Sequence, residues 1–124
     1  MGTLTFSQSP RIILGSDNQH LVSAVTTSLV KAGFDVETAT NYGHLEELWH
    51  KVRHDVVLFE ISHSDSIESA IESAIRIKRQ DAQQFIAYLA DANLHASGLT
   101  GDAILSRDTS RLPQALREAL DGRS

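Results

Sequence analysis

The stretch Val56-Val-Leu-Phe-Glu-Ile61 is the most apolar run in this sequence of 124 residues, and it decides the fold. A continuous apolar run of this length, with a single charge at Glu60, is typical of a central strand of a parallel sheet, because both faces of such a strand are covered. A polar loop follows, Ser62-His-Ser-Asp-Ser66, and it contains several residue types that favour helix N-termini. The run therefore predicts a buried strand that carries one acid near its carboxyl end.

Segments typical of strands and helices alternate on both sides of this run. Short apolar or alternating stretches predict four more strands, at residues 11–15, 34–40, 85–90 and 103–105. Apolar residues at helical spacing predict four helices, at residues 21–30, 45–52, 67–75 and 112–120. We expect Gly33 to end the first helix as the residue just past its C-cap, and Trp49 to lie in the core.

This alternation predicts a three-layer α/β fold. Strands joined through helices form right-handed crossovers and a parallel sheet with helices on both faces. Five strands within about 120 residues favour the flavodoxin-like strand order 2-1-3-4-5. Residues 11–121 are expected to form this one domain, with residues 1–10 as an N-terminal tail and residues 122–124 as a C-terminal stub.

Composition and charge exclude several classes of function. Sixteen acidic and eleven basic residues give a net charge of −5, which argues against non-specific binding to nucleic acid or to an anionic membrane. The chain has no cysteine, so disulfides, thiolate metal sites and cysteine nucleophiles are absent. No apolar run is long enough for a membrane span, and the first ten residues lack the features of a signal peptide. These features favour a cytoplasmic protein.

Three oxygen-bearing side chains form a candidate site before any family is considered. Ser16 and Asp17 follow the first predicted strand, and Glu60 lies at the end of the third. In a sheet of order 2-1-3-4-5 these two strands are neighbours at the switch point, where ligands bind beyond the carboxyl ends of the strands. The sequence therefore predicts that the three side chains lie close together.

Two segments carry a resemblance to a known family: Ile12-Ile-Leu-Gly-Ser-Asp-Asn18 and His54-Asp-Val-Val-Leu-Phe-Glu-Ile61. The first is similar to the strand that ends in an acidic pair in the receiver domains of two-component response regulators, and the second is similar to the strand with their phosphoacceptor aspartate. The resemblance covers residues 11–120. It implies a receiver-type fold, a magnesium-dependent phosphoacceptor pocket and a role in phosphorelay signalling.

The functional motifs of the family are not intact in this sequence. Ser16 stands at the first position of the acidic pair, so only Asp17 remains, and Glu60 stands at the phosphoacceptor position. The family's Thr or Ser position falls on Leu89. Its Lys-Pro pair falls on Leu105-Ser106 or on Ser106-Arg107. Its switch aromatic position falls on Asp102 or Ala103.

These departures predict a pocket that does not accept a phosphoryl group. Phosphoryl transfer to a carboxylate needs Mg²⁺ and donors that neutralise the developing charge. Leu89 and Leu105 offer neither a hydrogen bond nor a charge, and Asp17 and Glu60 would hold Mg²⁺ weakly at most. We therefore expect no metal and no cofactor.

Glu60 and Asp17 each have two interpretations at this stage. The longer Glu60 side chain could imitate a phosphorylated aspartate if Arg107 turned inward to meet it. We favour a solvated carboxylate at the strand end, because most carboxylates in proteins are exposed. Asp17 could bind metal, but we favour an N-cap for the first helix.

The last helix and the strand before it suggest a surface for a protein partner. In receiver domains this region and the fourth helix form the docking and dimer face. The stretch between Leu89 and Leu105 is short, which predicts a shortened fourth helix or a loop at residues 91–98. The candidate face contains charges of both signs, which could form reciprocal ion pairs in a homodimer or simply be solvated: Arg107, Arg111, Arg117 and Glu118.

The sequence as a whole predicts a degenerate receiver domain, not an enzyme, that acts through a signalling kinase, an effector domain or a second copy. It is expected to be either a stand-alone domain or one domain of a longer protein. One alternative is a receiver phosphorylated on Glu60 or His63, and another is a small flavodoxin-like cofactor binder. His50 and His54 have the spacing of two metal ligands on a helix, which is weak evidence for zinc without a third ligand.

Overall fold

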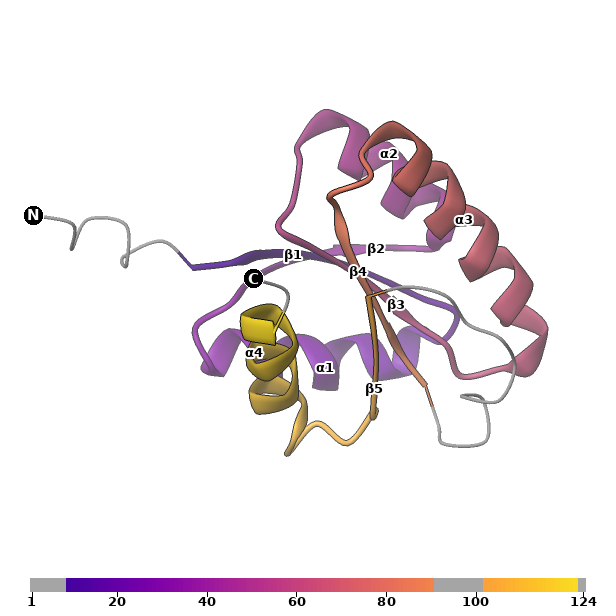
Figure 1. The fold of residues 1–124 in the computed structure, drawn as a ribbon. Coiled ribbons are helices and arrows are strands. Elements are labelled where there is room, and N and C mark those ends of the chain that lie inside the picture. Colours follow the sequence, from indigo (N-terminus) through magenta and orange to yellow (C-terminus); the bar gives the residue numbers. More distant parts are fainter. Residues whose placement is uncertain (1–8, 91–101, 123–124) are drawn as a thin grey trace, which may run out of the picture.

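A parallel five-stranded sheet forms the middle layer of the fold (Figure 1). The computed structural model describes residues 9–90 and 102–122. The strand order is β2-β1-β3-β4-β5, which confirms the predicted topology. The strands are β1 (Arg11–Ser16), β2 (Asp35–Ala39), β3 (Val56–Glu60), β4 (Phe85–Leu89) and β5 (Ala103–Leu105).

Helices cover both faces of the sheet, with α1 and α4 on one side and α2 and α3 on the other (Figure 1). Their bounds are α1 (Gln19–Lys31), α2 (Tyr42–Lys51), α3 (Ile67–Gln80) and α4 (Leu112–Gly122), and a short 3-10 turn, η2 (Ser64–Ser66), precedes α3. Gly122, which we expected in the C-terminal stub, is the last residue of α4. The expected loop at residues 91–98 lies outside the described residues. None of the helices in the described parts is long and apolar enough to cross a membrane.

Strand β3 is completely buried because both of its faces are covered. Val57 and Phe59 pack toward α2 and α3, whereas Val56 and Leu58 pack toward α1 and α4. Side chains alternate along a strand, so Glu60 shares a face with Val56 and Leu58 and points to the side of α1 and α4. The alternation that explains the apolar run also determines where the one acid points.

Large aromatic side chains organise the layer between the sheet and α2 and α3. Trp49 is fully buried, as predicted, and its Nε1–H donates a 2.8 Å hydrogen bond to Oε1 of Gln84. Phe59 packs edge-on against Tyr42 at 5.3 Å between ring centres and stacks on Tyr88 at 5.8 Å. These packed rings lie on the face of β3 that is covered by α2 and α3.

Gly33 ends α1 in a left-handed conformation, as predicted, with φ of 97°. The Gly33 N–H donates to the carbonyl of Val30 and the Phe34 N–H to that of Leu29, which is the Schellman arrangement. Phe34 is buried directly after this turn, and the Arg117 guanidinium of α4 lies over its ring. The turn therefore connects α1, β2 and α4 at one end of the molecule.

Replacing Gly33 with alanine tests this turn. A Cβ at positive φ is strained, so Gly33→Ala should lower the free energy of unfolding by about 1–2 kcal/mol. The measurement is urea unfolding followed by circular dichroism. Gly122→Ala is the matched control, since open space surrounds that position at the end of α4, and it should leave stability unchanged or slightly raised. Equal stability of Gly33→Ala and the unmodified chain would contradict the assignment.

Candidate functional site

Four positions that matter in receiver domains lie side by side in one row across the sheet. Ser16 of β1 pairs with Glu60 of β3, Glu60 pairs with Leu89 of β4, and Leu89 pairs with Leu105 of β5. The Ser16 hydroxyl is hydrogen-bonded to the Glu60 carboxylate, which confirms the prediction that these two side chains lie close together. Leu89 and Leu105 belong to the apolar core on the side of α1 and α4. The carboxylate of Glu60 is thus flanked on one side by a hydroxyl and on the other by two leucines.

Glu60 is buried, with only 1% of its surface exposed. The expectation of a solvated carboxylate is therefore wrong. Its Oε1 accepts a 2.6 Å hydrogen bond from the Ser16 hydroxyl, and its Oε2 accepts one of 2.9 Å from the Ser62 hydroxyl. Short O–H···O⁻ contacts of this kind are charge-assisted and strong. Burial is tolerated because both carboxylate oxygens are bonded.

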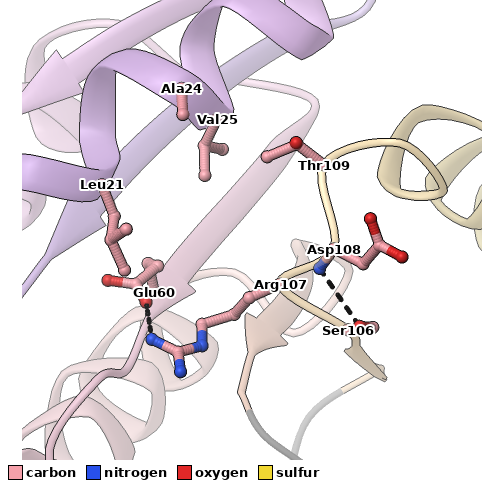
Figure 2. Close-up of a pocket in the computed structure, with 8 residues that line it drawn as sticks. All are labelled: Leu21, Ala24, Val25, Glu60, Ser106, Arg107, Asp108 and Thr109. Carbon is pink, nitrogen blue, oxygen red and sulfur yellow. Dashed lines mark hydrogen bonds and ion pairs between the residues drawn. The ribbon is translucent and has the colours of Figure 1, made fainter.

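Arg107 supplies the charge that balances Glu60. The residue lies in the connection between β5 and α4 and turns inward, so that its guanidinium reaches Oε2 of Glu60 at 3.2 Å (Figure 2). The same nitrogen donates a 2.8 Å hydrogen bond to the Ser62 hydroxyl. From the sequence, the Arg107 side chain could turn inward to meet Glu60, and the structure has this arrangement. A partly buried, hydrogen-bonded ion pair therefore lies beyond the end of β3.

Asp17 does not cap α1, contrary to our expectation. The N-cap is Asn18, whose side chain accepts a hydrogen bond from the His20 N–H. Asp17 instead accepts backbone hydrogen bonds from Ser62 at 2.8 Å and His63 at 2.9 Å. Burial acts to raise the Asp17 pKa, but these N–H groups, with side-chain hydrogen bonds from the same loop, hold the pKa below its ordinary value. Asp17 is therefore an anionic clamp on the loop that follows β3.

The Asp17 carboxylate also contacts the imidazole of His63. Its Nδ1 lies 3.2 Å from Oδ2 of Asp17, and 63% of its side chain is exposed. Because Asp17 is ionised at neutral pH, the neutral imidazole carries its hydrogen on Nδ1 and directs the Nε2 lone pair away from the carboxylate. His63 is thus an exposed residue with a defined orientation at the rim of the site.

Two side chains of the site, Ser62 and Tyr42, were missed in the sequence. Ser62 lies two residues after the end of β3, and its position alone could have identified it, since hydroxyls just beyond a strand end can face the same region as Glu60. Tyr42 begins α2 and donates a 2.8 Å hydrogen bond from its hydroxyl to the Glu60 carbonyl. Burial and the nearby charges of Asp17 and Glu60 raise the pKa of Tyr42, which keeps its hydroxyl a donor.

The residues present do not fit a Mg²⁺ ion. Ser16 lacks the second carboxylate of an acidic pair, Asp17 is engaged with two backbone N–H groups, and the Glu60 carboxylate already faces a cation. Mg²⁺ requires several oxygen ligands in near-octahedral geometry. In residues 9–90 and 102–122 no group of three or more potential metal ligands comes together.

The two histidines with metal-ligand spacing do not share a helix face. α2 ends at Lys51, so His54 lies beyond it and is buried with its Nε2 at 2.8 Å from Oε1 of Glu37. His50 remains on α2, where its ring packs against Trp49. The helical spacing therefore does not bring these side chains into one site.

The four residues proposed for a partner face do not form one surface. Arg107 points into the site, and Arg117 folds over Phe34 and donates to the carbonyl of Ala32. Arg111, directly before α4, and Glu118 of α4 remain exposed. The outward charge of α4 is therefore smaller than the sequence suggests.

Several solved structures with a similar architecture are response regulators. A response regulator from Thermotoga maritima has a TM-score of 0.75 at 16% identity, over 92% of this chain and 99% of that one. The chemotaxis response regulator CheY4 of Vibrio cholerae has a TM-score of 0.69 at 17% identity, over 90% and 99%. An orphan response regulator of H. pylori has a TM-score of 0.70 at 18% identity, over 90% and 97%. No protein-family model and no curated protein matches the sequence. The chain has the receiver fold.

The clamp formed by Asp17 predicts a pH-dependent contribution to stability. Because the folded-state pKa lies below the ordinary value of 3.8, this contribution is complete above the unfolded pKa and is lost as the pH falls through the folded one. Asp17→Asn should therefore lower the free energy of unfolding by about 1–3 kcal/mol at pH 7, and the deficit should shrink below about pH 4. Urea unfolding at pH 7, 5, 4 and 3 measures it.

Asp65→Asn, an exposed carboxylate of the same loop, is the control and should change stability by less than about 0.5 kcal/mol. A deficit of Asp17→Asn that stays constant down to pH 3 would show that its cause is not the carboxylate charge.

Proposed function

We propose that this domain is a receiver-type signalling module that is not phosphorylated at its strand-end pocket and acts by contact with a partner protein. One observation carries the proposal: the residue at the phosphoacceptor position, Glu60, is buried and paired with Arg107. The receiver fold supports the signalling class, and the pairing of Glu60 with Arg107 supports a mode of action without phosphoryl transfer. The proposal includes that the domain is not an enzyme.

Phosphorylation of Glu60 would require several unfavourable steps. An attacking carboxylate oxygen would have to leave its hydroxyl and guanidinium donors, each of which lowers its nucleophilicity. The departing oxygen would also cost Arg107 its 3.2 Å contact with the Glu60 carboxylate. Leu89 and Leu105, on the far side of Glu60, supply no donor for a phosphoryl oxygen. These costs argue against Glu60 as a phosphoacceptor.

The ion pair suits a domain with one fixed signalling state. Arg107 belongs to the connection that leads into α4, so its bond to Glu60 ties that connection to the central strand. The chain itself provides both charges of this bond. A partner would meet the outer side of α4, with Glu118 and with Arg111 directly before the helix, in a constant position. A second copy of the chain is one such partner.

A second candidate is phosphorylation of His63. The observation that favours it is the contact between its Nδ1 and Asp17, which orients Nε2 as a nucleophile on an exposed side chain. The same experiment tests both candidates, because a phosphoryl group on His63 is labile in acid and would be lost in His63→Ala.

Intact-mass spectrometry after incubation with acetyl phosphate and Mg²⁺ tests the proposed function. We expect no phosphoryl adduct on the unmodified chain, under conditions in which a receiver with an intact acidic pair is modified as the positive control. Arg107→Met is the informative variant, because its modification would show that the ion pair itself blocks the reaction. An adduct on the unmodified chain that disappears in Glu60→Gln would overturn the proposal. An adduct that disappears only in His63→Ala would replace it with the second candidate.

A further inference from the structure

Two adjoining hollows lie along α1, beside the connection from β5 to α4. The first has a volume of about 420 Å³, and its α1 wall is apolar, formed by Leu21, Ala24 and Val25 (Figure 2). The second has a volume of about 620 Å³. Ala24 and Thr109 line both hollows, so the two form one continuous groove, which we call the α1 groove.

The charged groups of the first hollow are already paired within the chain. Glu60 accepts a hydrogen bond from Ser62 and faces Arg107. Asp108 accepts hydrogen bonds from the N–H and the hydroxyl of Ser110. A ligand in this hollow therefore gains from burial of an apolar group against the α1 wall and not from an ionic contact.

The second hollow has a free cation and no acidic residue in its lining. Apart from the two shared residues it is lined by His20, Ser23, Thr27, Ser28 and Lys31. The Lys31 ammonium has no hydrogen-bond or ion-pair partner within the described part of the chain. Lys31 is therefore available to an anionic group of a ligand.

The apolar wall and the cation are separated by about two turns of α1. Ala24 and Lys31 are seven residues apart, which corresponds to about 10.5 Å along the helix axis. The side chains between them that line the groove are short, Thr27 and Ser28. The Ser28 hydroxyl donates a 2.6 Å hydrogen bond to the Thr109 carbonyl, which holds α1 and the β5–α4 connection at a defined separation.

A groove along α1 suits a helix better than an extended peptide. The N–H and C=O groups of α1 are bonded within the helix, so an extended peptide would lose water from its own backbone groups without gaining partners from α1. A helix has its backbone groups already bonded, and its side-chain ridges pack into the grooves of a neighbouring helix. Short side chains such as those between Ala24 and Lys31 allow this close approach.

We propose that the α1 groove binds an amphipathic helix of a partner protein. The helix places an apolar side chain in the first hollow and, about seven residues away on the same face, a carboxylate against Lys31. The inference rests on the proposed function only in that the domain acts by contact with a partner protein. It adds the chemistry of the partner and a contact on α1 in addition to the outer side of α4.

Selection from a yeast-displayed library of helical peptides tests the chemistry of the partner. The peptides have 20 residues and vary on one face among large apolar, neutral polar, acidic and basic residues, and the labelled unmodified chain is the bait. We expect enriched peptides to have a large apolar residue and an acidic residue about seven positions apart. With Lys31→Glu as the bait, the enriched residue at the acidic position should become Lys or Arg.

Matched variants test the location with the most enriched peptide, by fluorescence anisotropy at low salt. Lys31→Glu and Ala24→Phe should each weaken binding at least tenfold, the first by charge repulsion and the second by filling the first hollow. Lys51→Glu, at an exposed lysine at the end of α2, and Val30→Phe, at an exposed α1 position outside both linings, should change it less than twofold. Urea unfolding checks that the variants are folded, and Lys31→Gln replaces Lys31→Glu if the latter is not.

Two results of the peptide experiments would overturn the proposal: a selection that enriches no peptide, or enriched peptides that bind the Lys31 and Ala24 variants as tightly as the unmodified chain. Analytical ultracentrifugation tests the other occupant, since a dimer that Ala24→Phe dissociates would assign the groove to a second copy and also overturn the proposal. None of these results bears on phosphoryl transfer to Glu60, so failure here leaves the proposed function to its own test.

Discussion

The ion pair between Glu60 and Arg107 is the interaction on which the site depends. A carboxylate at the end of a strand with both faces covered has no access to water, so burial would be costly unless its charge and both oxygens were satisfied. Ser16, Ser62 and Arg107 meet this need from β1, the β3 loop and the β5–α4 connection. Elements that are distant in the sequence are therefore held together by one buried charge. The Asp17 clamp on the neighbouring loop completes the arrangement.

The fold followed from the sequence because apolar faces must be covered. The continuous run 56–61 requires helices on both sides, and the alternation of strands and helices leaves few topologies for a parallel sheet. The position of Glu60 next to Ser16 followed in the same way, since strand ends and register are set by the core. Gly33 was also predictable, because the end of a helix and a following buried aromatic residue leave it one suitable conformation.

The direction of individual polar side chains could not be predicted in this way. Asp17 and Asn18 are both good capping residues, so the sequence does not determine which of them caps α1. The choice depends on the N–H groups of Ser62 and His63, which bind Asp17 and lie near it only in the folded chain. Arg107 lies in a polar connection, and the sequence of that connection does not determine whether its side chain points to solvent or to the interior. The buried Glu60 carboxylate determines that it points inward. The expectation that Glu60 is solvated followed from the usual exposure of carboxylates and was wrong. A buried carboxylate needs partners, and at Glu60 one of them, Arg107, comes from a distant segment.

A double-mutant cycle on Glu60 and Arg107 tests this account most directly. Urea unfolding of the unmodified chain, Glu60→Gln, Arg107→Met and the double variant gives the coupling energy between the two side chains. We predict a coupling of about 1–3 kcal/mol. The surface pair Arg53 and Asp81, with side chains 51% and 35% exposed, should couple by less than about 1 kcal/mol in a parallel cycle. A Glu60–Arg107 coupling no larger than that of the surface pair would contradict the claim that this ion pair holds β3 and the β5–α4 connection together.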